Sequence, residues 1–308
     1  MRLKDLYLLP KVRDSFSYLY VEHCKIDQDA KSIALHDLNG KTCVPCANLT
    51  LLLVGPGTTI THAAIKTLSD SGCLVMWTGE MGVRFYASGM GETRAARNLL
   101  LQSYLCSIPK FRLRVVRRMY EMRFGEELAP DLSIQQIRGK EGVRVRTAYS
   151  RASQTTGVEW SGRSYRRDSW KDADPVNRAL SAANSCLYGI CQAAIVSAGF
   201  STALGFVHTG KMLSFVYDIA DLYKADLTIP MAFQAVAEGE DNLESRVRHA
   251  CRDKFHKEKL LPRIIPDIQE TLNIPIDETD EIFDFDEAAP GDLWDPDTGT
   301  AEGGKNWG

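Results

Sequence analysis

Three side chains that could bind a metal ion, His208, Asp218 and Asp221, lie close together in the sequence. An apolar segment leads to His208, and a second one carries the two acids three positions apart, a spacing that places both on nearly the same face of a helix. Carboxylates among apolar neighbours are costly to bury unless a positive charge meets them. A divalent cation with an imidazole ligand is one solution. Ion pairs with Lys211 and Lys224, or a solvated helix face, explain the same residues, so both interpretations stay open.

A second candidate is Glu141, the one acid in the basic segment 135–146. It lies between two glycines in a predicted helix, where each glycine costs about 1 kcal/mol, so their presence suggests close approach by a bulky partner. A phosphate backbone would fit, because arginines flank the segment on the same helix; they are Arg138, Arg144 and Arg146. The alternative is a local ion pair between Glu141 and a neighbouring arginine.

The elements that must position these residues differ between the two parts of the chain. Residues 1–88 contain short β-branched and aromatic segments separated by Gly-rich turns, which predict a small β-sandwich or sheet with one helix capped by Thr61. Asn39-Gly40 predicts the turn of a hairpin. Beyond residue 93 the apolar positions recur with helical spacing. The predicted helices cover 94–105, 111–124, a segment from 133 towards 149, 176–198 and the segment that carries Phe215, Ile219 and Leu222.

Capping signals support two of these helices. Ser133 with Gln136 is typical of a capping box, and Asp174-Pro175 supplies a cap and a first-turn proline. We therefore predict an α+β protein with an N-terminal β-rich domain at 1–88, a linker at 89–93 and a larger, all-helical catalytic domain at 94–276. Residues 277–308 are predicted to be an acidic, disordered tail.

The charge is distributed unevenly along the chain. The formal net charge is −3, yet residues 277–308 contain eleven Asp and Glu against one lysine, so this tail carries −10 and residues 1–276 carry +7. A basic body indicates a polyanionic partner. The tail also holds Phe283, Phe285, Trp294 and Trp307, which favours docking onto the body or onto a basic partner.

Composition places the chain among ordinary globular proteins, with 308 residues, 44% hydrophobic and 25% charged. No apolar run is expected to reach membrane-spanning length, and the N-terminus does not resemble a signal peptide, so we expect a cytoplasmic protein. The eight cysteines show no disulfide pattern. Cys43 and Cys46 form a CxxC, but no second pair completes a zinc ribbon, and a strand rather than a helix follows.

Three segments resemble motifs of a single family. They are Arg138–Arg144, Gly205–Lys211 and Ser214–Asp221, and the likeness extends over nearly all of residues 1–276. The family is that of the CRISPR adaptation integrases, CRISPR-associated nucleases that insert new spacers. The chain looks closest to its type I-E branch.

The resemblance implies roles for individual residues. Glu141, His208 and Asp221 would be catalytic ligands of Mg²⁺ or Mn²⁺, with Asp218 beside them as a further catalytic residue. Tyr165 and Lys211 would read one end of the incoming DNA. Further DNA contacts are implied for Tyr188, Arg84, Lys66 and Arg248, in addition to the arginines of the Glu141 helix.

The resemblance also implies an assembly and a reaction. A homodimer would join a second dimer through a small ferredoxin-like CRISPR-associated companion dimer, giving a four-plus-two complex that binds double-stranded DNA with 3′ overhangs and CRISPR repeat DNA. The DNA 3′-hydroxyl would attack the repeat phosphodiester in a transesterification, and water in its place would give endonuclease activity. A non-catalytic DNA-holding scaffold and an unrelated metal phosphohydrolase are the alternatives.

Overall fold

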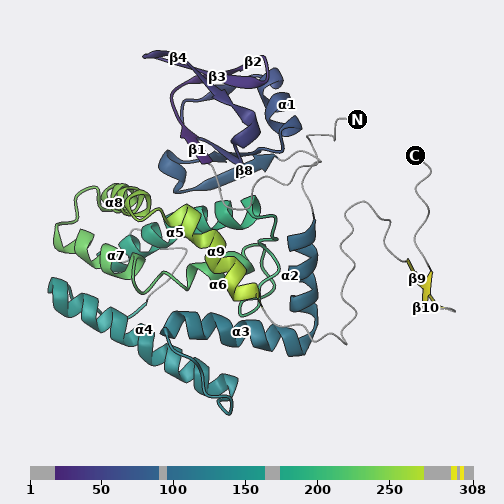
Figure 1. The fold of residues 1–308 in the computed structure, drawn as a ribbon. Helices are drawn as coiled ribbons and strands as arrows, with labels where there is room; N and C mark the ends of the chain where they lie inside the picture. Colours follow the sequence, from purple (N-terminus) through teal and green to yellow (C-terminus); the bar gives the residue numbers. More distant parts are fainter. Residues whose placement is uncertain (1–17, 90–95, 164–173, 274–292, 297–298, 302–308) are drawn as a thin grey trace. The chain divides into compact units, whose positions relative to one another are not determined.

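The computed structural model describes residues 18–89, 96–163, 174–273, 293–296 and 299–301 (Figure 1). Tyr165, most of the predicted linker and most of the acidic tail lie outside these residues. Contacts divide the chain into two units, residues 1–274 and 275–308. In the second unit, β9 (Leu293–Asp295) and β10 (Gly299–Ala301) pair in the antiparallel direction.

Two four-stranded sheets form the N-terminal region, with the orders β1-β5-β7-β8 and β4-β3-β2-β6. In the first sheet β1, β5 and β7 are parallel and β8 is antiparallel to β7. In the second, β2, β3 and β4 are antiparallel neighbours and β6 is parallel to β2. The strands are β1 (Tyr18–Val21), β2 (Lys25–Asp29), β3 (Ser32–Asp37), β4 (Gly40–Pro45), β5 (Leu51–Val54), β6 (Thr59–Ile60), β7 (Leu74–Thr78) and β8 (Phe85–Gly89).

Helix α1 (His62–Asp70) joins the two sheets through a common core. It contacts β2 and β3 of one sheet and β7 of the other, and its buried Ala64 and Leu68 belong to the same apolar cluster as Ile26 and Leu52. The side chain of Thr61 accepts a hydrogen bond from the Ala64 amide, as the cap prediction requires. The expected β-rich region with one helix is therefore confirmed.

The hairpin between β3 and β4 differs in detail from its prediction. Asp37 pairs with Gly40, so Leu38 and Asn39, rather than Asn39 and Gly40, form the turn. The Asp37 carboxylate accepts the Asn39 amide at 2.8 Å, and such Asx turns compete with a turn built on positive φ at Asn-Gly. Gly40, at φ 122°, supplies the unusual backbone conformation as the first residue of β4.

The second region is helical, and the predicted helices are confirmed with small shifts of their ends. Ser133 forms the complete capping box with Gln136, and Asp174 caps the helix that Pro175 begins. The helices are α2 (Arg97–Ser107), α3 (Pro109–Phe124), α4 (Ile134–Thr156), α5 (Pro175–Ser197), α6 (Ser214–Ala220), α7 (Thr228–Ala237), α8 (Leu243–Lys257) and α9 (Leu260–Leu272).

Helix α5 is the centre of this region, in contact with α6, α7, α8 and α9 (Figure 1). Its small residues allow this close packing. The expectation that no segment reaches membrane-spanning length is wrong for α5: among the described helices it is the one long and apolar enough to cross a membrane. Most of it is buried among its neighbours, and a core helix needs the same composition.

Strand β8 also contacts α5, and the two residues before this strand approach the helix at Gly189. A Cβ at Gly189 would lie 2.9 Å from backbone atoms of Val83 and Arg84. The glycine therefore permits the β-rich region to pack directly on the central helix. An N-terminal β-sheet region followed by a helical region confirms the predicted α+β fold, whereas the boundaries at 88, 93 and 276 remain predictions.

Candidate active site

The segment before α6 is held by the buried carboxylate of Asp218, which has no solvent exposure. Its Oδ2 accepts the backbone amides of Phe206 and Val207, and its Oδ1 accepts the amide of His208 at 2.9 Å. The same Oδ1 lies 2.7 Å from Nδ1 of the His208 ring. Because an ionised carboxylate can only accept, this contact suits the tautomer with the proton on Nδ1, in which Nε2 offers a lone pair to a ligand. Asp218 thus orients His208.

Asp221 has a different environment, although it follows Asp218 by three residues. Helix α6 ends at Ala220, so Asp221 is its C-terminal cap, and the expected helical continuation through Leu222 is wrong. Its Oδ1 accepts a hydrogen bond from Nζ of Lys224 at 2.6 Å. Burial acts to raise the pKa of Asp221, but the charges of Lys224 and Arg123 outweigh it and hold the pKa below its ordinary value. Neither acid lies on a solvated face.

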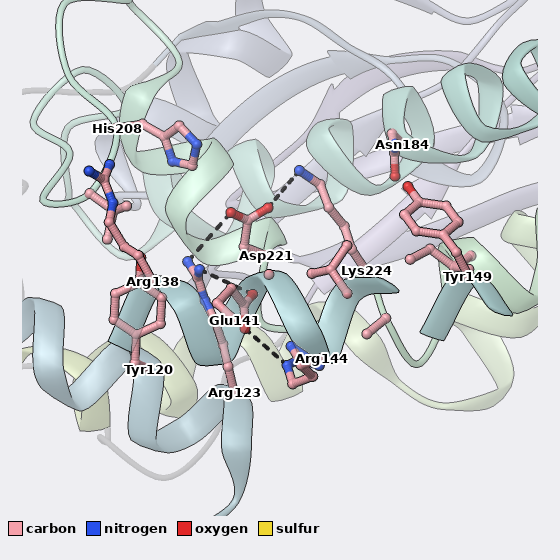
Figure 2. A pocket seen from close by; sticks show the side chains of 15 residues that line it. Tyr120, Arg123, Arg138, Glu141, Arg144, Tyr149, Asn184, His208, Asp221 and Lys224 are labelled. Carbon is pink, nitrogen blue, oxygen red and sulfur yellow. Dashed lines mark hydrogen bonds and ion pairs between the residues drawn. The ribbon is translucent and has the colours of Figure 1, made fainter. Parts of the chain in front are cut away.

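Glu141 reaches the same place from α4. Its Oε1 lies 3.6 Å from Nη1 of Arg123, whose Nη2 lies 3.5 Å from Oδ2 of Asp221. Figure 2 shows the Arg123 side chain between the two carboxylates. Oε2 of Glu141 accepts a hydrogen bond from Nε of Arg144 at 3.1 Å, so the local ion pair considered from the sequence is present. It coexists with the convergence of Glu141 on Asp221.

These side chains line an open cavity of about 480 Å³. Arg138 and His208 lie along its edge, and Tyr149 and Asn184 lie at its other end (Figure 2). The cavity lining also includes Tyr120, Arg123, Glu141, Gly142, Arg144, Val145, Val207, Asp221, Lys224, Ala225 and Ile229. Carboxylates, an imidazole and several cations therefore face one volume, an arrangement that suits a bound phosphodiester.

The chemical types of Glu141, Asp221 and His208 suit a divalent cation. Two carboxylates and an imidazole are ordinary ligands of such an ion, and a carboxylate on the other ring nitrogen of a ligating histidine, as Asp218 provides, is the usual supporting contact. As the side chains stand, no three His, Cys, Asp or Glu residues of the described chain are close enough together to hold a metal. Arg123, Lys224 and Arg144 already pair with the carboxylates, so an incoming metal ion would have to replace these ion pairs.

The remaining described residues predicted from the sequence to contact DNA do not line the cavity. Tyr188 lies beside the cavity, since Nζ of Lys224 is 4.9 Å from the centre of its ring. Tyr165 lies outside the described residues. The others lie outside the cavity lining: Lys66 on α1, Arg84 before β8, Arg146 on α4, Lys211 before α6 and Arg248 on α8.

Sequence reasoning gave no role to several residues that the structure brings to the site. Arg123 is one of five arginines on α3, and no spacing rule distinguishes the buried one from the others. Lys224 was considered only as an alternative partner of the acids. Tyr217 contacts both His208 and Tyr188 with its ring, at centroid distances of 5.8 Å and 5.0 Å. The available signal was its place directly before Asp218 in the sequence.

The chain is similar to known proteins over most of its length. A family described as CRISPR associated protein Cas1 matches residues 121–248. The CRISPR-associated endonuclease Cas1 2 of Thermus thermophilus is 51% identical over 99% of this chain and 94% of its own length, and the CRISPR-associated endonuclease Cas1 of Escherichia coli K12 is 42% identical over 85% and 86%. The crystal structure of a TtCas1–DNA complex is 53% identical, with a TM-score of 0.81 over 86% of this chain and 99% of that one. The chain belongs to the Cas1 family of CRISPR-associated endonucleases.

Proposed function

We propose that the protein is a metal-dependent DNA integrase with endonuclease activity, which inserts captured DNA into a CRISPR array. The observation that carries this proposal is the convergence of Glu141, His208 and Asp221 on one cavity that is also lined by Arg138 and Lys224. Acidic and imidazole ligands serve a metal, while the surrounding cations serve a polyanion. An unrelated phosphohydrolase is set aside by the family membership.

Glu141, Asp221 and His208 would hold Mg²⁺ or Mn²⁺. When bound, the ion would polarise the phosphodiester and stabilise the attacking oxygen. Asp218 would favour the tautomer with the proton on Nδ1 of His208, which leaves Nε2 as the ligand atom. Arg138 and Lys224 offset the charge that develops on the phosphate oxygens. The chain supplies no covalent nucleophile in this scheme.

The reaction exchanges one phosphate ester for another. The 3′-hydroxyl of the captured DNA forms a new P–O bond, and the P–O bond to the repeat strand breaks in line with it, which leaves a 3′-hydroxyl on that strand. The proton of the attacking hydroxyl goes to solvent, and the departing oxygen takes one up. Positioning the two DNA ends then supplies much of the rate enhancement.

The proposal also covers the path of the DNA and the assembly of subunits. The DNA would run from the cavity over Tyr188, Lys211 and Tyr165, and over the basic residues Arg84, Lys66, Arg144, Arg146 and Arg248. The protein would act in the cytoplasm as a type I-E homodimer, two of which bind a small ferredoxin-like companion dimer. The relative whose structure contains DNA supports DNA as the partner.

The test combines the protein, the companion subunit, a short duplex with 3′ overhangs and a plasmid carrying the repeat, with Mn²⁺ or Mg²⁺. We expect strand joining that EDTA abolishes. Glu141→Gln, His208→Ala and Asp221→Asn should each lower the rate at least 100-fold, because each removes a ligand of the proposed metal.

Glu159→Gln is the matched control, since Glu159 is exposed and lies outside the cavity lining, and it should join DNA at the wild-type rate. Joining that continues in EDTA would exclude the metal. Joining that all three ligand variants perform at the wild-type rate would exclude the site. DNA binding without joining would favour a scaffold.

A further inference from the structure

Arg123 is the most enclosed charged side chain among those that line the cavity: its exposed fraction is 3%, against 18% for Glu141 and 20% for Asp221. It is in the last turn of α3. Its guanidinium lies over the ring of Tyr120, with Cζ 5.0 Å from the centroid. A guanidinium is always protonated in proteins, so a permanent positive charge is fixed at the back of the site.

The guanidinium contacts both carboxylates of the proposed metal site and the main chain of the residue that supports its imidazole. Besides Glu141 and Asp221, it donates a hydrogen bond from Nη2 to the main-chain oxygen of Asp218 at 3.3 Å. Asp218 is the residue that orients His208. The side chain of Arg123 thus connects α3, α4 and α6, the three elements on which the two carboxylates and the support of the imidazole depend.

The pairing with the carboxylates is loose. Distances of 3.6 Å to Glu141 and 3.5 Å to Asp221 exceed those of a direct charge-assisted hydrogen bond, and Nε of Arg123 is buried without a hydrogen-bond partner. Lys224 and Arg144 each make a closer pair with one carboxylate, at 2.6 Å and 3.1 Å. The Arg123 guanidinium lies near both carboxylates at once without binding either tightly.

We infer that Arg123 is a resident counter-cation, a positioning residue that holds Glu141 and Asp221 together until a divalent metal takes over the two carboxylates. This inference rests on the metal site of the proposed function. Two negative charges in a partly buried site repel each other, and a cation between them offsets this repulsion. Arg123 supplies that cation in the metal-free protein. When a metal ion binds, the positive charge of Arg123 lies within a few ångströms of it, and the repulsion between the two cations weakens metal binding.

Arg123 has opposite effects in the metal-free and the metal-bound protein. Without metal, Arg123 stabilises the fold. With metal, it weakens binding, so that its removal should tighten Mn²⁺ binding, an effect that a purely structural arginine would not have. Arg123→Met keeps most of the apolar stem and removes the charge, whereas Arg123→Lys keeps the charge.

The experiment measures Mn²⁺ affinity by electron paramagnetic resonance and the melting temperature in EDTA and in Mn²⁺. We expect Arg123→Met to melt lower than wild type in EDTA, to bind Mn²⁺ roughly tenfold more tightly, and to gain more in melting temperature from Mn²⁺ than wild type does. Arg123→Lys should stay near wild type. Arg118→Met is the matched control, because Arg118 is on the same helix and pairs with Glu270 outside the cavity lining.

Several results would overturn the inference. Mn²⁺ binding to wild type that Arg123→Met leaves unchanged or weakens would refute it alone and leave the proposed metal site in place. Mn²⁺ binding to neither protein would refute the metal site and the inference together. If Arg123→Met does not fold, the double variant with Glu141→Gln decides: recovered folding in EDTA supports the inference, since less negative charge then needs neutralising, and failure to recover contradicts it.

Discussion

At the scale of single residues, Asp218 and Asp221 look equivalent in the sequence but have different roles in the site. Asp218 is fully buried and uses both oxygens on the backbone of residues 206–208 and on the ring of His208. Asp221 faces the cavity. The difference lies in their partners: backbone amides and an imidazole surround Asp218, whereas Lys224 and Arg123 pair with Asp221.

Asp218→Asn should therefore damage the site without removing a metal ligand. An amide has one acceptor oxygen, so its NH₂ group would face a backbone amide or Nδ1 of His208. We expect a loss of about 1–3 kcal/mol in the free energy of unfolding and a 10–100-fold weaker Mn²⁺ affinity, measured by urea unfolding and by Mn²⁺ titration. Asp226→Asn, an exposed acid of the following segment, is the control. Wild-type Mn²⁺ affinity in Asp218→Asn would contradict the supporting role.

At the scale of elements, the sequence predicts the ends and caps of helices well, but it predicts poorly which helices bring their side chains together at the site. The Ser133–Gln136 box, the Thr61 cap and the Asp174-Pro175 start depend on residues a few positions apart, and each is present. The site depends instead on the meeting of three helices: the last turn of α3, the second turn of α4 and the C-terminal end of α6. Nothing local indicates that Arg123, on α3, meets Glu141 and Asp221, and only resemblance connected Glu141 with His208.

The contact between the β-rich region and α5 yields a prediction at this scale. Because a Cβ at Gly189 would lie 2.9 Å from the backbone of Val83 and Arg84, Gly189→Ala must push the segment before β8 away from the helix. We expect a loss of about 1–3 kcal/mol in the free energy of unfolding, measured in urea.

Gly139→Ala provides the matched helical control. A Cβ at Gly139 has no neighbour within 4 Å, so alanine should stabilise α4 by about 0.5–1 kcal/mol through its helix propensity. The pair of variants separates close packing from propensity. Equal effects of the two substitutions would show that the close approach at Gly189 does not limit stability.

At the scale of the whole molecule, the distribution of charge matters more than its sum. Residues 1–276 carry +7 and the tail at 277–308 carries −10, so one polypeptide contains both a basic body and a polyanion. Clustered acids on a tethered segment have a high effective concentration near the body. We therefore predict that the tail competes with DNA for the basic body, and that the competition weakens as salt screens both interactions.

Changing the eleven acids of the tail to Asn and Gln should therefore tighten DNA binding roughly tenfold at low ionic strength, and the gain should shrink as salt is added. Fluorescence anisotropy with a labelled duplex across a salt series measures both effects. The control exchanges Asp for Glu and Glu for Asp throughout the tail, which keeps the −10 charge and should leave binding at the wild-type level. If neutralisation leaves affinity unchanged at every salt concentration, the tail does not compete with DNA.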